Sequence, residues 1–379
     1  MIPLSVPELR GNEWKYIKEC LDTNWVSSVG SYVNRFEKEI AAFTGAGYAI
    51  ATSNGTAAIH LSLLLTNIEP GDLVIIPDIT FVAPANCITY CGAIPLLMDV
   101  DIDTWQIDIN LLQSYLEQNC SVNNGKCIQS STGKVIRAVL PVHVLGNICD
   151  MDRLQRLAQE WKIMLIEDAT EALGSYWNTK HAGTFGFTGC LSFNGNKIIT
   201  TGGGGMILTD NKEVAEKAKH LSTQAKTTQL EYFHDQVGFN YRLVNILAAL
   251  GVAQLEQLPK ILIDKKSIAD RYNQNLNKLG FITGQKVESN AVVNNWLYTV
   301  KLPRNRELML YLKNNNIESR PLWTPLHLLP AFKDCSFITK EKVSDLLYNS
   351  CLSLPCSSGI SDNDVKFVSS KIEEFYSNG

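Results

Sequence analysis

The stretch "VIRAVLPVHVLGNICDMDRLQRLAQEWKIMLIED", residues 135–168, decides the expected fold, because strand-like and helix-like patterns alternate along it. The apolar runs at 135–144 and 162–168 are typical of buried strands. Between them, residues 150–161 repeat apolar side chains at helical spacing, and Asp150 is placed to cap that helix. A strand, a helix and a second strand in this order predict a mostly parallel sheet with helices on both faces.

The same pattern extends toward the N-terminus, where "DLVIIP" (72–77) and "GAIPLLMDVD" (92–101) indicate further buried strands. A helix is expected around 36–43. The polar stretch 118–134 is typical of a surface hairpin or loop.

After about residue 255 the alternation loosens, and three helical patterns of a different domain follow. We therefore expect an α/β large domain at 1–255 and a smaller C-terminal α+β domain at 256–379, with the N-terminal segment a candidate to pack on the small domain. The three helical patterns are "ADRYNQNLNKLG" (269–280), "RELMLYLKNNN" (306–316) and "DNDVKFVSSKIEEFY" (362–376).

Composition excludes several classes of protein. With 379 residues and 45% hydrophobic side chains, the chain is long enough for two domains with substantial cores. The net charge is −4 and no basic run is present, so nucleic acid is not an expected partner. The ten cysteines form no CxxC pair and the six histidines no HxxxH, so a metal site has little support. The N-terminus lacks a secretory h-region and no apolar run reaches the ~18 residues of a membrane span, so we expect a cytoplasmic protein.

Polar and aromatic residues follow several strands, and ligands of such sheets bind at the carboxyl ends of the strands. In "ATSNGTAAIHLSLLL" (51–65), the turn at 54–56 would present free N–H groups at a helix N-terminus, which suits a phosphate. An ordinary helix cap explains that turn about equally well. Phe81 follows a strand, either as a ligand contact or as a core aromatic. Glu167 and Asp168 end a strand, and strand alternation turns them to opposite faces, so only one need meet a ligand.

"SFNGNKIITTGGGGM" (192–206) places Lys197 between a polar turn and four glycines. It matches neither GxGxxG nor the Gly-Lys-Ser/Thr of a P-loop. Taken alone, Lys197 is better explained as a solvated surface lysine than as a reactive residue. Together with a phosphate-binding turn, an aromatic and a strand-end carboxylate, it predicts pyridoxal phosphate. Lys197 would form the Schiff base, Asp168 would pair with the pyridinium nitrogen, Phe81 would stack on the ring, Ser192 would bind the phosphate, and glycines 202–205 would let the backbone turn next to the cofactor.

These motifs stand in one order along nearly the whole chain: "SNGTAAIHLSLL", "ITFVAPANCITYCGAIPLLMDVD", "LPVHVLGNICDMD", "IEDATEALGS", "SFNGNKIITTGGGGM", "GFNYRLVNILAALGVAQL" and "RPLWTPLH". In this order they resemble the DegT/StrS-type nucleotide-sugar aminotransferases, which have the aspartate-aminotransferase (fold type I) architecture. The resemblance implies Lys197 as the Schiff-base lysine and Asp168 as the pyridine partner. It implies Phe81 on the ring, phosphate contacts from Thr56, Ala57 and Ser192, and a homodimer in which Asn240 reaches the phosphate of the neighbouring subunit.

Two positions depart from the family pattern. Many relatives have glutamine where this chain has Glu171, a position that faces the phenolic oxygen of the cofactor. Gly203 stands where a glutamate is usual. Two other functions compete with an aminotransferase. A sugar dehydratase of the same family would carry histidine in place of Lys197. A non-catalytic cofactor-binding sensor would be fused to a DNA-binding segment, and none is visible.

The finer resemblance is to aminotransferases of bacillosamine and legionaminic acid assembly. It implies that the amino group of L-glutamate moves to C4 of a 4-keto-6-deoxy nucleotide sugar, UDP-2-acetamido-2,6-dideoxy-4-keto-hexose, for bacterial surface glycans. The alternative substrate is GDP-linked 4-keto-6-deoxy-mannose, as in perosamine-type enzymes. Hydrogen-bonding side chains suited to the sugar are Ser27, Asn194 and His327, and Arg242 or Arg320 could bind the diphosphate.

Overall fold

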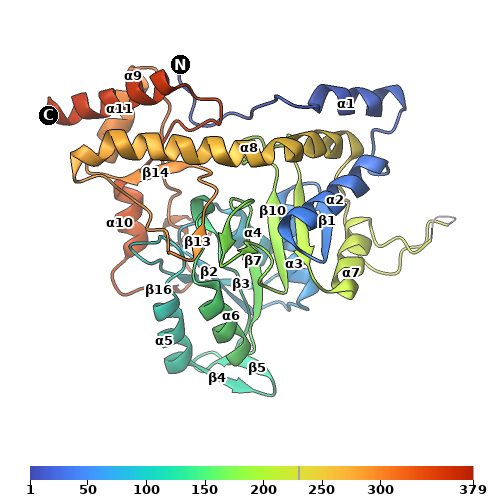
Figure 1. Ribbon diagram of the computed structural model, residues 1–379. Helices are drawn as coiled ribbons and strands as arrows, with labels where there is room; N and C mark the ends of the chain where they lie inside the picture. The colour runs from blue at the N-terminus through green and yellow to red at the C-terminus, as the bar shows by residue number, and fades with distance from the viewer. Residues whose placement is uncertain (229–230, 379) are drawn as a thin grey trace.

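The computed structural model describes residues 1–228 and 231–378, and its centre is a ten-stranded sheet (Figure 1). Strands β4 and β5 form a hairpin that joins the sheet through β6, in the stretch expected to be a hairpin or loop. The other eight strands run, in sheet order, β1 (Tyr48–Thr52), β11 (Gly205–Thr209), β10 (Thr188–Ser192), β7 (Met164–Asp168), β6 (Val135–Val139), β2 (Leu73–Pro77), β3 (Ile94–Met98) and β16 (Phe337–Ile338), and the hairpin is β4 (Cys120–Asn123) and β5 (Lys126–Gln129).

Strand direction places several carboxyl ends at one edge of this sheet. The strands from β10 through β7, β6, β2 and β3 to β16 are parallel. Strand β11 is antiparallel to both β10 and β1, so β1 runs in the same direction as β10. The carboxyl ends of β1, β2, β7 and β10 therefore meet at the same edge, where ligands of such sheets bind.

Both faces of the sheet are buried. Along β2, Leu73 and Ile75 belong to one core cluster, whereas Val74 and Ile76 belong to a second. Because successive side chains of a strand point to opposite faces, the two clusters lie on opposite sides of the sheet. This is the continuous apolar pattern of a mostly parallel sheet covered by helices, and it confirms the expected α/β class.

Helix α6 begins where local chemistry predicts. The side chain of Asp150 accepts the N–H of Arg153 and caps α6, as the sequence indicated. The helices are α1 (Glu13–Asp22), α2 (Ser31–Thr44), α3 (Gly55–Leu65), α4 (Ala83–Tyr90), α5 (Ile109–Asn119), α6 (Met151–Glu160), α7 (Lys212–Ser222), α8 (Asn245–Leu276), α9 (Asn305–Asn314), α10 (Val343–Ser350) and α11 (Asp362–Ser377), with short 3-10 turns η1 (Val144–Gly146), η2 (Asn277–Leu279) and η3 (Leu326–Leu328).

The C-terminal part has its own sheet and core. A four-stranded antiparallel sheet packs with α9 and α11 around a separate hydrophobic cluster. Its strands are β12 (Thr283–Gly284), β14 (Tyr298–Lys301), β17 (Cys351–Leu354) and β15 (Arg320–Pro321), and a small third sheet contains β13 (Ala291–Val292), β8 (Tyr176–Trp177) and β9 (Lys180–His181).

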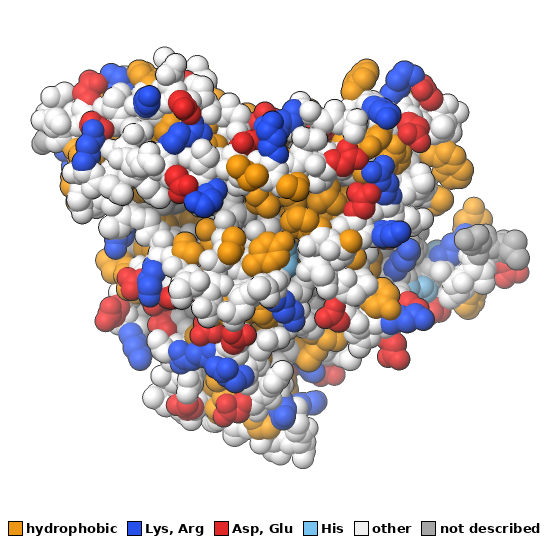
Figure 2. Space-filling view, in the orientation of Figure 1, with side chains coloured by type: hydrophobic (Ala, Val, Ile, Leu, Met, Phe, Trp, Pro, Cys, Tyr) orange, Lys and Arg blue, Asp and Glu red, His pale blue; other side chains and the backbone are white. Residues whose placement is uncertain are grey.

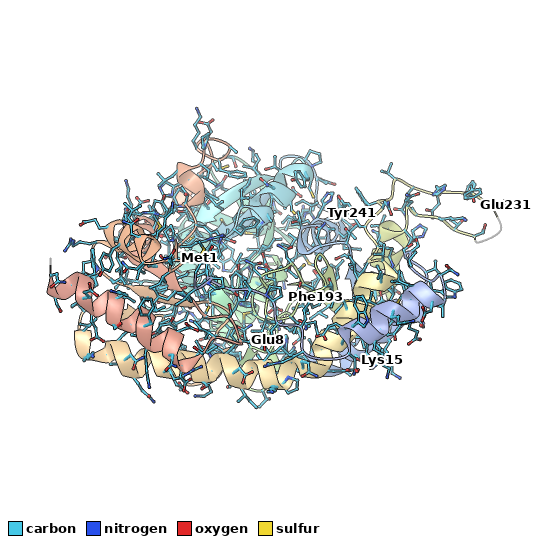
Figure 3. The ribbon with its side chains drawn as sticks, turned by 90° about the horizontal axis from the view of Figure 1, so that it is seen from above. Met1, Glu8, Lys15, Phe193, Glu231 and Tyr241 are labelled. Atoms are coloured by element: carbon cyan, nitrogen blue, oxygen red, sulfur yellow. The ribbon has the colours of Figure 1, made fainter. Side chains whose placement is uncertain are left out.

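Helix α8 runs through residue 255 without a break, so the chain passes between the two parts inside a helix. We propose that the boundary between a large and a small domain lies within α8. The N-terminal segment lies against the C-terminal part, where Ile2 N–H donates to Asn316 O at 2.8 Å and Cys356 N–H donates to Leu4 O at 2.8 Å. Figure 3 shows Met1 among the C-terminal elements and Lys15 of α1 near the other end of α8.

Helix α8 with η2 is long and apolar enough, by length and composition, to cross a membrane, which the sequence reading had not anticipated. Half of its most apolar window is buried in this fold, and a core helix of a soluble protein passes the same test. Figure 2 shows hydrophobic side chains gathered near the middle of one face, alongside α8. These features are consistent with a soluble protein, and a cytoplasmic location stays a prediction.

Candidate active site

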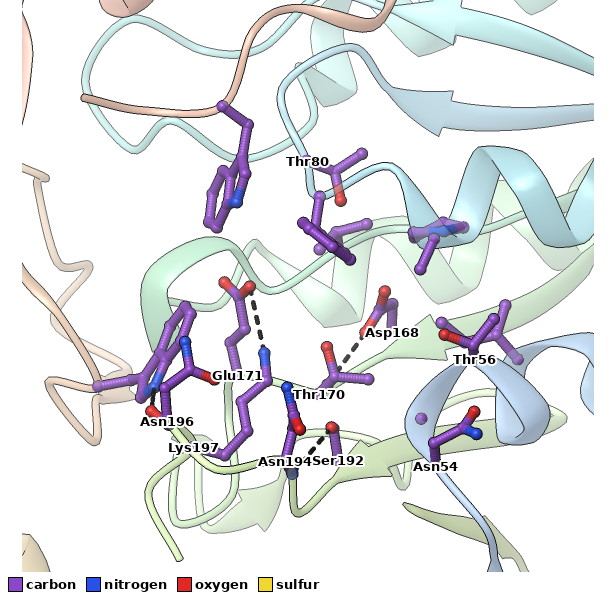
Figure 4. A pocket seen from close by; sticks show the side chains of 18 of the residues that line it. Asn54, Thr56, Thr80, Asp168, Thr170, Glu171, Ser192, Asn194, Asn196 and Lys197 are labelled. Carbon is purple, nitrogen blue, oxygen red and sulfur yellow. Dashed lines mark hydrogen bonds and ion pairs between the residues drawn. The ribbon is translucent and has the colours of Figure 1, made fainter. Parts of the chain in front are cut away.

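A cavity of about 330 Å³ lies at the edge where the carboxyl ends of the parallel strands meet. Asp168 ends β7, Ser192 ends β10, and the turn between β1 and α3 contributes residues 54–56. Thr80 and Phe81 follow β2. Figure 4 shows Thr56, Thr80, Asp168 and Ser192 around Lys197, whose amine points into the space between them.

The N-terminus of α3 forms one wall of the cavity. The side chain of Asn54 accepts the N–H of Ala57 at 2.7 Å, and Gly55 and Thr56 begin the helix beside it. Gly55 packs tightly against Ser192, because a Cβ added at Gly55 would lie 2.9 Å from the Ser192 Cβ. A helix N-terminus without side-chain bulk, next to a serine hydroxyl, is suited to a phosphate group.

The glycine run after Lys197 has a different neighbour from the one expected. A Cβ added at Gly205 would lie 2.4 Å from the carbonyl oxygen of Asn54 and 2.7 Å from the nitrogen of Gly55. Gly205 therefore lets strand β11 approach the backbone of the phosphate-binding turn. Gly202 has a φ of +79°, which favours glycine, whereas a Cβ at Gly203 would meet only one atom, at 3.9 Å.

Asp168 and Glu167 lie on opposite faces of β7. Glu167 turns away from the cavity and accepts backbone N–H groups from Gly183, Phe185 and Gly186. Asp168 lines the cavity and accepts the N–H of Thr170 at 3.0 Å. Burial raises the pKa of the Asp168 carboxyl, and the hydrogen bonds from Thr170 oppose that rise. A buried carboxylate of this kind would be stabilised by a cation within the cavity.

Lys197 and Glu171 form a close pair in the same cavity. The Lys197 Nζ lies 3.6 Å from Glu171 Oε1, and Glu171 Oε2 accepts the N–H of Leu145 at 2.8 Å. Burial raises the pKa of Glu171 from its ordinary value of 4.5 to about 7, although Lys197 opposes this rise. Glu171 can thus hold or release a proton near neutral pH, next to an amine.

We expect Glu171→Gln to change the pH dependence of stability. The pKa of Glu171 in the folded chain lies above its ordinary value, so its proton contributes stability that is fully present below pH 4.5 and is lost as the pH rises through about 7. The glutamine variant lacks this loss. The melting temperature of the variant, relative to that of the wild type, should therefore rise by a few degrees between pH 4.5 and 8. Thermal unfolding of both proteins without cofactor would test this, and a pH-independent difference would contradict it.

The structure does not bring every candidate residue to the cavity. Among the described residues, those that line it include Lys197, Asp168, Glu171, Thr56, Phe81, Ser192, Asn194 and Arg320. The others lie elsewhere: Ala57 is buried in the first turn of α3, Ser27 and Asn240 are exposed, Arg242 pairs with Glu37 at 2.7 Å, and His327 Nδ1 lies 2.7 Å from Asp78 Oδ2.

The position of Arg242 is explained by its partners. It is buried, and its guanidinium donates to Glu37 and to the carbonyl of Ala51 at 3.1 Å. Both contacts use the same nitrogen and hold the side chain against β1, outside the cavity lining. Of the two arginines expected to bind a diphosphate, Arg320 is the one that the fold places at the cavity.

Several cavity residues were not found by sequence reasoning. Thr80 is buried and, in the part of the chain that the structure describes, its hydroxyl has no hydrogen-bond partner. Trp296 and Trp323 come from the C-terminal part, about 100 residues beyond Lys197 in the sequence. Thr80 follows a predicted strand directly before Phe81, so its position in the sequence could have indicated a cavity residue. Trp323 lies in the motif "RPLWTPLH", which indicated the family but no role for the tryptophan, and nothing local marks Trp296.

The residues present fit pyridoxal phosphate. A helix N-terminus with a serine can hold its phosphate, a desolvated carboxylate can pair with its ring nitrogen, and a lysine reaches the same space. The side chain of Phe81 is 55% exposed, so an aromatic face remains available for a planar ligand. The fold and this cavity define an enzyme that uses pyridoxal phosphate to transfer amino groups.

The chain belongs to the DegT/DnrJ/EryC1/StrS aminotransferase family, whose model matches residues 7–373. It is 36% identical to the GDP-perosamine synthase of Escherichia coli O157:H7 and 37% identical to that of Vibrio cholerae, with 99% of each chain covered. A DegT DnrJ EryC1 StrS aminotransferase from Brucella abortus superposes with a TM-score of 0.88 at 26% identity, over 96% of this chain and 95% of that one. The aminotransferase TlmJ from Streptoalloteichus hindustanus gives 0.90 at 25% identity, over 100% and 99%. The protein is a pyridoxal-phosphate-dependent sugar aminotransferase.

Proposed function

We propose that this enzyme transfers the amino group of L-glutamate to C4 of GDP-linked 4-keto-6-deoxy-mannose. The observation that carries this choice is the full-length similarity to three proteins named GDP-perosamine synthase, at 36–37% identity. The UDP-linked acetamido sugar expected from the sequence receives no such support from the relatives. Bacterial surface glycans remain the proposed destination of the product.

The proposed roles of the residues follow from their positions. Pyridoxal phosphate supplies, when bound, an aldehyde that carries the amino group and a ring that accepts electrons. Lys197 binds this group through its amine and moves protons at the carbon that gains or loses the amino group. Asp168 holds a proton on the ring nitrogen. Thr56 and Ser192 bind the phosphate together with the N-terminus of α3.

The rest of the cavity offers polar groups to a sugar nucleotide. Asn194 and Asn196 are exposed and line the cavity, and the Thr80 hydroxyl faces it without a partner among the described residues. These groups suit the hydroxyls of a neutral hexose. Arg320 also lines the cavity, and its guanidinium suits the diphosphate of a nucleotide carrier.

A homodimer is part of the proposal. Residues 224–228 and 231–238 belong to an arm that projects from the body of the chain near α7 (Figure 1), and Asn240 follows this arm. In the arm, Tyr232 is 91% exposed and Val237 is 84% exposed. Large apolar side chains so exposed are typical of a protein contact. In a dimer this arm would lie against the partner subunit, as the proposed phosphate contact of Asn240 requires.

Turnover with defined sugars tests the substrate. Purified enzyme with L-glutamate would be incubated separately with the GDP-linked 4-keto-6-deoxy sugar, its dTDP-linked counterpart and the UDP-linked acetamido sugar, and the products identified by mass spectrometry. We expect amination of the GDP-linked sugar at least tenfold faster, a preference of about 1.4 kcal/mol in the barrier. Faster amination of the UDP-linked or dTDP-linked sugar would overturn the GDP assignment but not the class of enzyme.

A further inference from the structure

Trp296 contacts Lys197 in two ways. The ring of Trp296 lies 4.2 Å from the Lys197 Nζ, as in a cation–π contact. Its indole N–H donates to the carbonyl oxygen of Asn196 at 2.7 Å, which fixes the backbone directly before Lys197. The side chain is only 3% exposed, so this ring is held in one place rather than moving in solvent.

Asn294 connects this tryptophan to Glu171. Its side-chain oxygen accepts the N–H of Trp296 at 2.9 Å, and its side-chain nitrogen donates to the carbonyl of Glu171 at 2.8 Å. Asn294 is 1% exposed and also donates to Leu173 O at 3.0 Å. The pair Asn294 and Trp296 therefore contacts both members of the Lys197–Glu171 pair, although it lies about 100 residues away in the chain.

A buried lysine completes this arrangement. The side-chain nitrogen of Lys265, in α8, donates to the carbonyl of Trp296 at 2.7 Å and to that of Cys356 at 2.6 Å, and burial lowers the pKa of this amine. Lys265 of α8 thereby ties the segment before β14 to the segment that follows β17. Trp296, whose backbone and indole polar groups are all hydrogen-bonded, thus connects the C-terminal part of the chain to the reactive lysine.

We propose that Trp296, held by Asn294, is a positioning residue that keeps the amine of Lys197 beside Glu171 and favours the cationic form of its nitrogen. This rests on the proposed role of Lys197. The indole N–H bond restrains the backbone, and the aromatic face stabilises positive charge on the nitrogen. Because Glu171 can accept or release a proton near neutral pH and the Lys197 amine lowers its pKa, a change in the position of Lys197 would change the protonation of Glu171.

The other charged groups around Lys197 are accounted for. Glu171 and Asp168 approach from the segment at the end of β7, and Arg320 of β15 lines the same cavity. Lys265 lies on the far side of the Trp296 backbone. All four side chains are unchanged in a variant of Trp296. A difference between variant and wild type in the pH midpoint of the cofactor absorbance would therefore result from loss of the ring itself.

The test compares Trp296→Leu and Trp296→Phe in the enzyme loaded with cofactor. The absorbance of the bound cofactor is recorded against pH, since the nitrogen of Lys197 bonded to it titrates. In Trp296→Leu the midpoint should fall by about one pH unit, the size of shift that a cation–π contact supplies. Trp296→Phe keeps an aromatic face, so its midpoint should stay within about 0.3 unit, while loss of the N–H bond lowers kcat by about fivefold with little change in KM.

Trp177→Phe is the matched control. Trp177 is 4% exposed and its indole N–H donates to Asp152 at 3.0 Å, but it does not line the cavity among the described residues. Its variant should keep the wild-type midpoint and kcat. A Trp296→Leu midpoint within 0.2 unit of wild type overturns the proposal. If that variant does not fold, equal kcat losses in Trp296→Phe and Trp177→Phe overturn it, and a loss confined to Trp296→Phe supports it. In Lys197→Ala the pH-dependent absorbance band should disappear. A band that persists in this variant would mean that the assignment of Lys197 is wrong, whatever the role of Trp296.

Discussion

Lys197→Ala should abolish transamination while the chain stays folded. The amine of Lys197 is the only lysine nitrogen at the cavity among the described residues, so without it neither covalent capture of the cofactor nor proton movement at the reacting carbon has a donor. We expect kcat to fall by at least about a thousandfold. The measurement is formation of 2-oxoglutarate in the presence of the keto sugar, together with borohydride reduction and peptide mass mapping, which should locate the cofactor on Lys197 in the wild type alone.

The structure explains why this variant should fold. Lys197 lowers the pKa of Glu171, so removing the amine lets that buried carboxyl take up a proton instead of remaining an unpaired charge. Lys197→Arg is the matched control, because it keeps a cation near Glu171 but cannot form the covalent bond. Both variants should be inactive with near-native melting temperatures. Residual turnover within tenfold of wild type in Lys197→Ala would exclude Lys197 as the reactive residue.

The central sheet could be predicted because its signals are local. The runs at 72–77, 135–144 and 162–168 are apolar enough to be buried on both faces, and each contains one of the strands β2, β6 and β7. The helix boundary at Asp150 was also local, since a side chain three residues from its partner forms the cap. Strand ends then identified Asp168 and the turn at 54–56 without any knowledge of the tertiary structure.

What the sequence could not show depends on contacts between distant segments. Arg242 was a reasonable diphosphate ligand until its pairing with Glu37, 205 residues earlier in the chain, placed it against β1. The glycine run was expected to let the backbone turn next to the cofactor, and the structure adds a role that the sequence did not indicate, because Gly205 lets β11 approach the backbone of Asn54 and Gly55. Trp296 enters the cavity from the C-terminal part through hydrogen bonds to Asn196 and Lys265, which no pattern within its own segment predicts.

The expected boundary near residue 255 illustrates the same limit. The alternation of strands and helices loosens there because the helices that follow pack on a different sheet, but the helix that spans the change is continuous from Asn245 to Leu276. A helical pattern reports which residues face a core, not which core they face. The change in pattern therefore marked a change of packing partner within α8 rather than the end of an element.

Asp168→Asn should raise the melting temperature of the chain without cofactor and lower the activity of the enzyme with cofactor. Without cofactor, burial raises the pKa of Asp168, so its carboxyl contributes stability that is present below pH 3.8 and is lost as the pH rises through its higher folded value. Asparagine removes that loss and its side-chain oxygen can still accept the N–H of Thr170. The variant without cofactor should thus melt at a higher temperature than the wild type at pH 7.

With cofactor bound, the same substitution should lower the activity of the enzyme. A neutral amide cannot hold a proton on the ring nitrogen, whereas an opposite charge at contact distance shifts a pKa by about 1–3 units, equivalent to roughly tenfold to a thousandfold in rate. We expect kcat to fall within that range while some cofactor remains bound through its phosphate. Asp168→Glu, which keeps the charge, should recover part of the rate. An unchanged kcat in Asp168→Asn would mean that another residue faces the ring nitrogen, and a lower melting temperature without cofactor would mean that the Asp168 carboxylate is already stabilised by a cation of the protein itself.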